Sequence, residues 1–186
     1  MGLKEIRLHG RGGQGVVKAS QIIVKAAVEC ELCAQFIPFF GVERKGSPVY
    51  GFLRIDDDEI RRKTQIYEPD VIIVMDDTLC ALPQTFAGLK QGGTVLVNST
   101  KPLGELCVPS CAGSVAAVDA TGISEELFGQ NLPNTAVVGA FARVVGLVDV
   151  ETLLDEVAAA FGDKNRIAAE RGYAGAHYLK GGKAGE

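Results

Sequence analysis

The sequence predicts a single three-layer α/β/α domain whose mixed sheet is mainly parallel, and three observations support this fold class. Segments with strand and helix patterns alternate along the 186 residues, which is the order expected of an α/β domain. Residues 71–75 form a continuous apolar run, typical of a central parallel strand. The chain also opens with a strand pattern, a glycine-rich loop and a helix pattern. We therefore expect one domain over residues 1–179, followed by a flexible tail at 180–186.

The opening unit places a glycine loop between a strand and a helix. Residues 4–9 alternate polar and apolar side chains, as in a strand, and residues 16–29 suit a helix packed on a sheet. Gly10, Gly12 and Gly15 have the G-x-G-x-x-G spacing, which makes this a Rossmann-like start. The loop and the helix start offer free backbone N–H groups, so they suit a phosphate or another anion. Alternatively, the glycines serve only a tight turn and close packing of helix on sheet.

A dinucleotide site of this kind needs one further residue. The second strand should end in a carboxylate that binds the ribose. We expect that strand at residues 33–37, and it is followed by Pro38, Phe39 and Phe40. The missing acid counts against a nicotinamide or flavin site. A free-standing nucleotide-binding module or oxidoreductase nevertheless stays as the alternative function.

A second loop is predicted at residues 38–48. Two prolines and two glycines disfavour regular structure there, and the segment combines aromatic rings with the charges of residues 43–45. Loops of this length tend to carry function, so we interpret this one as a contact surface. The alternative is a solvated connection with Phe39 and Phe40 packed onto the core.

The rest of the chain continues the alternation of strands and helices. The strand at 49–55 is expected to be antiparallel because no helix precedes it. Asp76 and Asp77 follow the apolar run at a carboxyl end, where α/β sheets often place ligands, but we favour a helix cap. The further expected strands are 94–98 and 114–118, and the expected helices are 78–89, one starting at Ser124, 134–145, 150–161 and 164–178.

Composition excludes several classes of protein. Hydrophobic residues make up 47%, which supports a substantial core. Nineteen basic and 23 acidic residues give a net charge of −4 without a basic block, so we expect no nucleic-acid partner. No apolar run approaches the roughly 18 residues that span a bilayer, and no signal-peptide pattern begins the chain. We therefore expect a cytoplasmic protein that does not bind membranes.

Cysteine and histidine give no metal or catalytic set. The five cysteines form one C-x-x-C, at Cys30 and Cys33, between a predicted helix and a strand. Because zinc normally needs a second pair, we interpret the cysteines as free thiols, either buried or incidental. His9 ends the first strand, where it could act as a general base, although we favour a structural role. No nucleophile elbow or Walker loop is present.

Two motifs together resemble a known family. Residues 10–16 read Gly-Arg-Gly-Gly-Gln-Gly-Val, and residues 38–48 read Pro-Phe-Phe-Gly-Val-Glu-Arg-Lys-Gly-Ser-Pro. Both resemble the gamma subunit of 2-oxoacid:ferredoxin oxidoreductases, although Lys45 replaces the usual arginine and Ser47 a common glycine. The segments around 134–140 and 164–173 are also similar, so the resemblance covers nearly the whole chain.

The resemblance implies a non-catalytic subunit of a multi-subunit enzyme that binds no cofactor alone. Its partners would be alpha, beta and ferredoxin-like delta subunits, which hold thiamine diphosphate, magnesium and [4Fe–4S] clusters, and ferredoxin would accept the electrons. The two loops would dock the thiamine-bearing subunits and take coenzyme A phosphates on backbone N–H groups, Arg11 and Arg44, unless the chain is purely a scaffold. The expected contact residues are Gly10, Arg11, Gly12, Gly13, Gln14, Gly15, Gly41, Glu43, Arg44, Lys45, Gly46 and Asn134.

Overall fold

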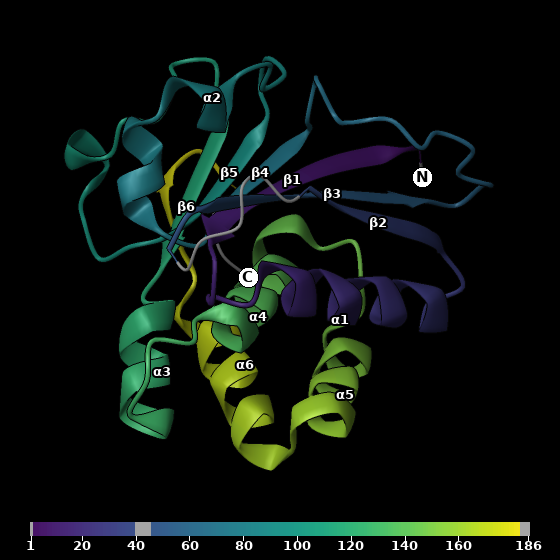
Figure 1. Cartoon of the computed structure of the whole chain (residues 1–186), viewed down its shortest axis with the longest axis vertical. Coiled ribbons are helices and arrows are strands. Elements are labelled where there is room, and N and C mark those ends of the chain that lie inside the picture. The colour runs from purple at the N-terminus through teal and green to yellow at the C-terminus, as the bar shows by residue number, and fades with distance from the viewer. Residues whose placement is uncertain (1, 40–45, 183–186) are drawn as a thin grey trace.

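The computed structural model of the chain describes residues 2–39 and 46–182. Within them, seven strands form one mixed sheet in the order β2-β3-β1-β4-β5-β6-β7 (Figure 1). The pairs β1–β4, β4–β5 and β5–β6 are parallel, and the pairs β2–β3, β3–β1 and β6–β7 are antiparallel. The strands are β1 (Lys4–Arg11), β2 (Cys33–Phe39), β3 (Pro48–Asp56), β4 (Val71–Val74), β5 (Thr94–Asn98), β6 (Ser114–Val118) and β7 (His177–Lys180).

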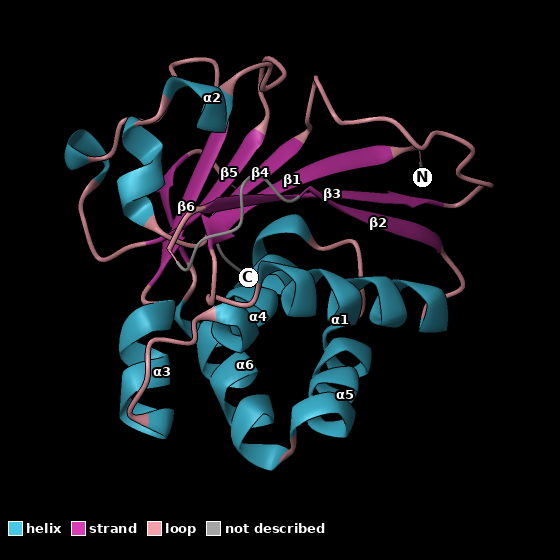
Figure 2. Cartoon of the chain, in the orientation of Figure 1, coloured by secondary structure: helices cyan, strands magenta, loops and turns pink. Residues whose placement is uncertain are grey.

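Helices cover the two faces of the sheet unequally. Five α-helices lie on one face, while short helical turns lie on the other, as Figure 2 shows. The predicted three-layer α/β class is therefore confirmed, with one thin outer layer. The first face carries α1 (Val16–Glu29), α3 (Ala120–Phe128), α4 (Asn134–Val145), α5 (Val150–Phe161) and α6 (Asp163–Gly175); the second carries η1 (Asp77–Ala81), α2 (Pro83–Phe86) and η2 (Leu103–Glu105).

The central strands are buried on both faces. In β4, Ile73 belongs to the apolar core beneath the large helices, whereas Ile72 and Val74 belong to the core on the opposite face. Alternate side chains of a strand point to opposite faces, so a strand between two cores must be apolar throughout. This explains the continuous apolar run that the sequence shows at 71–75.

The first βαβ unit is split by an inserted strand. Strand β3 pairs antiparallel with both β1 and β2, so β1 and β2 run in the same direction without touching. The predicted antiparallel direction of the third strand is confirmed. In a dinucleotide-binding fold the second strand lies directly beside the first. Here the carboxyl end of β2 is one strand further away, which adds to the case against a dinucleotide site.

Two buried arginines fix the irregular segment between β3 and β4. Arg54 is 1% exposed, forms an ion pair with Glu5 at 2.9 Å, and donates to the carbonyls of Thr64 and Gln65. Arg7 donates to the carbonyls of Ile66 and, at 2.9 Å, Thr85. A buried guanidinium needs such partners. The two side chains therefore hold a segment without regular structure against the sheet.

Several expected boundaries are wrong. Strand β2 continues through Pro38, and β3 begins at Pro48, because an edge strand and a strand's first position both tolerate proline. The helix expected at 78–89 is broken into η1 and α2, with Pro83 at the start of the second piece. Helix α3 begins after its cap Asp119, not at Ser124. Helix α6 ends at Gly175, and β7 follows it.

The predicted domain over residues 1–179 and the predicted flexible tail at 180–186 stay predictions. Lys180 belongs to β7, Gly181 and Gly182 follow it, and residues 183–186 of the expected tail lie outside the described residues.

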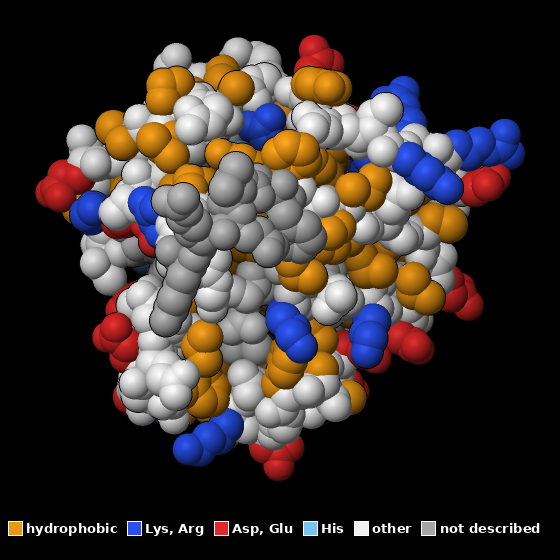
Figure 3. Space-filling model, viewed as in Figure 1, with side chains coloured by type: hydrophobic (Ala, Val, Ile, Leu, Met, Phe, Trp, Pro, Cys, Tyr) orange, Lys and Arg blue, Asp and Glu red, His pale blue; other side chains and the backbone are white. Residues whose placement is uncertain are grey.

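Over the part of the chain that the structure describes, no helix is both long and apolar enough to cross a membrane. On the face shown in Figure 3, basic and acidic side chains are interspersed.

Candidate functional site

The glycine loop lies at the point where the chain changes direction across the sheet. From β1 the chain crosses through α1 to β2 and β3 on one side, and then returns to β4 on the other side of β1. Ligands of open α/β sheets bind outside the carboxyl ends of the strands at such a point. Asp76 follows β4 and Asn98 ends β5, so both reach the same edge as the loop.

Two glycines of the loop leave no room for a side chain. Gly15 has a φ of 81°, and a Cβ added there would lie 2.9 Å from Cβ of Asn134. A Cβ added at Gly10 would lie 2.5 Å from Cγ2 of Val16. Both distances are too short for a real side chain. The structure thus brings Gly15 and Asn134 together, although 119 positions separate them in the sequence.

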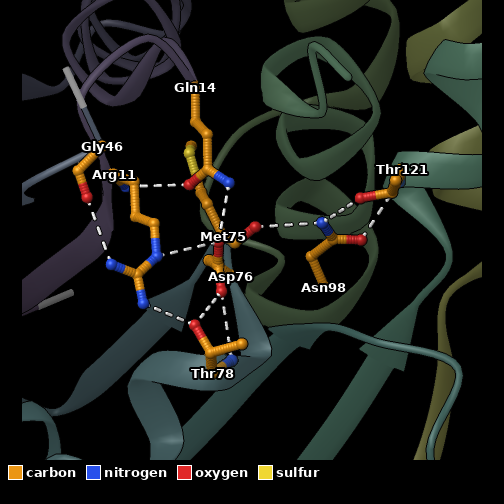
Figure 4. Close-up of polar contacts among 8 residues, drawn as sticks. All are labelled: Arg11, Gln14, Gly46, Met75, Asp76, Thr78, Asn98 and Thr121. Atoms are coloured by element: carbon orange, nitrogen blue, oxygen red, sulfur yellow. Dashed lines mark hydrogen bonds and ion pairs between the residues drawn. The ribbon is translucent and has the colours of Figure 1, made fainter. Parts of the chain in front are cut away.

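Asp76 is the centre of a hydrogen-bond network that holds the loop (Figure 4). Its Oδ2 accepts from Nε of Arg11 at 3.2 Å and from Nε2 of Gln14 at 3.0 Å. Its Oδ1 accepts from the backbone N–H of Thr78 at 3.1 Å and from the Thr78 hydroxyl. Burial alone would raise the pKa of Asp76, but the hydrogen bonds from Thr78 and Gln14 and the charge of Arg11 hold it below its ordinary value.

Arg11 connects the glycine loop to the end of the second loop. Its guanidinium donates to the carbonyl of Gly46 at 3.1 Å and to the Thr78 hydroxyl at 2.7 Å, besides Asp76. The backbone N–H of Gly12 donates to the Ser47 carbonyl at 2.9 Å. The structure therefore brings Gly46 beside residues 10–15. The other expected contact residues of that loop, Gly41, Glu43, Arg44 and Lys45, lie outside the described residues.

Two helices begin beside this loop. Helix α1 starts after Gly15 and α4 starts at Asn134, and among the described residues neither start is capped by a side chain. The first N–H groups of a helix have no partner within it and carry the positive end of the helix dipole. This edge can therefore bind an anion through backbone groups.

A polar hollow of about 270 Å³ adjoins the network. Buried Asn98 shapes its floor: Nδ2 donates to the Met75 carbonyl at 3.0 Å, and Oδ1 accepts from the backbone N–H of Ala120 at 2.9 Å. Asn98 thereby fixes the end of β4 and the start of α3, and with them the position of Asp76. The hollow is lined by Gln14, Met75, Asp76, Asp77, Asn98, Ser99, Thr100, Asp119, Thr121 and Asn131.

His9 is not placed to act as a base. It is 2% exposed, and its Nε2 accepts from Nε of Arg7 at 3.1 Å. Burial, and then the charge of Arg7, lower its pKa to about 3. A group that stays neutral and enclosed fits the structural interpretation of the sequence.

The described residues contain no group of three or more His, Cys, Asp or Glu side chains arranged to hold a metal. The five cysteines are free, and burial raises the pKa of the Cys80 thiol to about 12.

The sequence predicted the glycines, Arg11, Gln14 and Asn134 as site residues, but it did not predict Asp76 as the centre of the network or Thr78 and Asn98 as its supports. The position of two carboxylates directly after a buried strand was the available signal.

Comparison with known proteins assigns the chain to a family. The family described as "Pyruvate ferredoxin/flavodoxin oxidoreductase" matches residues 5–175. The "Pyruvate/ketoisovalerate oxidoreductases common subunit gamma" of Thermococcus kodakarensis is 47% identical over 91% of this chain and 95% of that protein. The gamma subunit of the "NADH-dependent phenylglyoxylate dehydrogenase" of Aromatoleum evansii is 45% identical over 91% of this chain and 92% of that protein.

Solved structures agree with this assignment. The pyruvate oxidoreductase subunit PORC of Thermotoga maritima superposes with a TM-score of 0.84 and 34% identity, over 97% of this chain and all of that one. The keto/oxoacid ferredoxin oxidoreductase gamma subunit of Geobacter sulfurreducens shares the fold, with a TM-score of 0.76, 23% identity, and coverage of 94% and 97% of the two chains.

The chain therefore belongs to the pyruvate ferredoxin/flavodoxin oxidoreductase family, a class of enzyme assembled from several kinds of subunit or domain. Within that class it is the gamma subunit of a 2-oxoacid oxidoreductase, as the two sequence motifs predicted.

Proposed function

We propose that this chain is the non-catalytic subunit of an enzyme that oxidatively decarboxylates a 2-oxoacid to acyl-CoA and CO2 and passes electrons to ferredoxin. The chemistry would belong to partner subunits: alpha and beta chains with thiamine diphosphate and magnesium, and a delta chain with [4Fe–4S] clusters. Two features of this chain favour a non-catalytic role. Its one histidine near the site is buried and neutral, and Asp76 is committed to four hydrogen bonds within the chain.

The proposed contact surface consists of residues 10–15, Gly46, Ser47 and Asn134, here called the loop surface. The observation that carries it is the pair of bonds joining two distant segments, from Gly12 to Ser47 and from Arg11 to Gly46. We propose that the loop surface docks the thiamine-bearing subunits and contacts coenzyme A. Coenzyme A carries phosphates, and the starts of α1 and α4 offer uncapped backbone N–H groups for an anion.

Arg11 has a different part in this proposal from the one expected from sequence. Its guanidinium already donates to Asp76, Thr78 and Gly46. A phosphate would have to compete with those bonds. We therefore assign the anion contact to backbone N–H groups and Asn134, and assign to Arg11 the role of holding the two loops together.

The identity of the 2-oxoacid is proposed to depend on the partner subunits. The relative from Thermococcus kodakarensis is named a common subunit of pyruvate and ketoisovalerate oxidoreductases, and the relative from Aromatoleum evansii belongs to a phenylglyoxylate dehydrogenase. Gamma chains of similar sequence thus occur with different substrates. A surface that contacts coenzyme A, the acyl acceptor proposed here, is consistent with that pattern.

A matched pair of glycine substitutions tests the loop surface. Gly13 and Gly92 both have positive φ, 101° and 79°, and both have open space where a Cβ would lie. Alanine should therefore cost each a similar amount of stability, about 1–2 kcal/mol. Gly13 is on the loop surface and Gly92 is not. In the enzyme purified from the native host, Gly13→Ala should raise the KM for coenzyme A or reduce recovery of the partner subunits, with either change about tenfold.

Thermal unfolding of the two purified chains serves as the control for that comparison. If Gly13→Ala and Gly92→Ala lose activity to the same degree, the loss reflects backbone strain and the loop surface is not a contact. Unchanged assembly and unchanged kinetics of Gly13→Ala would also remove the loop surface from the proposal.

A further inference from the structure

The Asp76 carboxylate connects the glycine loop to η1 and, through Arg11, to the second loop. Oδ2 faces the glycine loop, where it accepts from Arg11 and Gln14, and Oδ1 faces η1, where it accepts twice from Thr78. Through Arg11 the network continues to Gly46 of the second loop. Figure 4 shows the hydrogen bonds that the Asp76 carboxylate accepts from Arg11, Gln14 and Thr78.

The carboxylate is itself held in a fixed place. Asp76 has extended backbone angles, φ −143° and ψ 113°, and caps the start of η1. The carbonyl of the preceding residue, Met75, accepts from Asn98, whose side chain also binds α3 through Ala120 and Thr121. The backbone N–H of Met75 donates to the His9 carbonyl at 2.8 Å. Strands β1, β4 and β5 together therefore set where Asp76 lies.

The loop is also held through its backbone, by the pairing of β1 with β3 at Gly10 and Arg11 and by the bond from Gly12 to Ser47, and Asp76 adds the side-chain anchor. Inside the loop, the backbone N–H of Arg11 donates to Oε1 of Gln14 at 2.8 Å, and the N–H of Gln14 donates to the Arg11 carbonyl at 3.0 Å. The Gln14 amide is thus folded back onto Arg11, with its other end on Asp76. If Asp76 no longer accepts, both the Gln14 amide and the Arg11 guanidinium lose their common partner.

From this geometry we propose that Asp76 is a positioning residue for coenzyme A, which sets the conformation of the glycine loop without touching the ligand. The inference rests on the proposed function of the loop surface. The positioning role requires a charged acceptor with two oxygens, because each oxygen of Asp76 accepts hydrogen bonds from two donors. Hydrogen bonds to a charged acceptor are stronger than neutral ones, so the network should depend on the carboxylate.

The substitution Asp76→Asn separates the two halves of the network. An amide has one acceptor oxygen, so it can keep the bonds to Thr78 or those to the glycine loop, but not both. Its NH2 group would face donors on the other side. We expect the KM for coenzyme A to rise about tenfold while kcat changes less than about twofold, since the loss resembles that of one charge-assisted hydrogen bond.

Asp149→Asn is the matched control. Asp149 also caps a helix, α5, by accepting from the backbone N–H and the hydroxyl of Thr152 at 2.9 and 3.0 Å. Within the described residues, Asp149 makes no hydrogen bond to the glycine loop. A general loss of stability from weakened capping would therefore appear in both variants. A change in the KM for coenzyme A should appear only in Asp76→Asn.

Hydrogen exchange on the full-length chain gives a second readout that does not depend on activity. The amides of Arg11 and Gln14 should exchange faster in Asp76→Asn than in the wild type and in Asp149→Asn. If their exchange and the KM both stay at the wild-type level, Asp76 does not position the loop. A changed KM for Gly13→Ala beside an unchanged one for Asp76→Asn would overturn this inference alone. Unchanged kinetics and assembly for both would instead overturn the proposed function.

Discussion

His9 is a single residue whose ionisation should couple folding to pH. Burial and the charge of Arg7 lower its pKa in the folded chain to about 3, whereas a histidine in an unfolded chain has a pKa of about 6.5. Between these values the unfolded chain binds more protons than the folded one. The free energy of unfolding should therefore fall as the pH falls through this window, and the contribution should be fully present above pH 6.5.

The corresponding prediction uses the two histidines of the chain. His9→Gln should remove a slope of up to about 1.4 kcal/mol per pH unit from the stability of the chain between pH 6.5 and 5. His177→Gln is the control, because the side chain of His177 is exposed and that of His9 is buried. Urea unfolding at several pH values measures both. Equal slopes in the wild type and His9→Gln would show that His9 does not carry the coupling.

At the same scale, the sequence predicted the glycine positions better than the acid that holds them. Gly10 and Gly15 are recognisable because their spacing and the neighbouring strand and helix are local in the sequence. The contacts from Asp76 to Arg11 and Gln14 cross more than 60 positions. They depend on β4 pairing with β1, which residue patterns do not specify. The sequence pattern at Asp76 therefore predicts only a helix cap. In the structure Asp76 caps η1 and also holds the glycine loop.

Among the elements, the closest packing lies between α4 and α6. A Cβ added at Gly139 of α4 would lie 1.8 Å from the Ala169 carbonyl oxygen, and one at Gly172 of α6 would lie 1.9 Å from that of Ala136. Both oxygens belong to helix backbones, which cannot move alone. The two glycines thus allow the helices to cross at short distance, with α4 buried between α6 and the sheet.

Two glycines of α6 provide a matched test of this crossing. Gly172→Ala should destabilise the chain by about 3 kcal/mol or more, because the backbones must separate. Gly175→Ala, in the same helix but with open space at its Cβ, should change stability by less than about 1 kcal/mol. Thermal or urea unfolding of the two variants decides between them. Similar stabilities would mean that the crossing adapts readily to a methyl group.

The sequence predicted most elements because their patterns are local, and it failed where tertiary contacts decide. The bounds of α1, α4 and α5 agree with expectation, since each has an apolar face and, for α5, a capping aspartate. The residue pattern predicts a helix through residue 178 where β7 begins, because an edge strand of four residues shows no clear alternation. The effects of Pro38, which lies inside β2, and of Pro83, which begins α2, also depend on their neighbours rather than on proline itself.

At the scale of the whole molecule, the chain has a gamma-subunit fold and a structured edge but no complete catalytic set among its described residues. The glycine loop, Gly46 and Asn134 meet at the carboxyl ends of the strands, held by Asp76. This arrangement suits a surface that is completed by other chains. It predicts that the purified chain alone shows no oxidation of 2-oxoacids and that activity requires the assembled complex.

The most direct measurement is purification of the tagged chain from its native host, followed by identification of its partners and an assay of the same fraction. The assay follows coenzyme A-dependent reduction of a low-potential dye with a panel of 2-oxoacids. We expect thiamine- and cluster-bearing subunits to co-purify in fixed ratio, with activity toward at least one acid that is lost when the subunits are separated. A chain that purifies alone, without such partners and with a bound nucleotide, would contradict the proposed function.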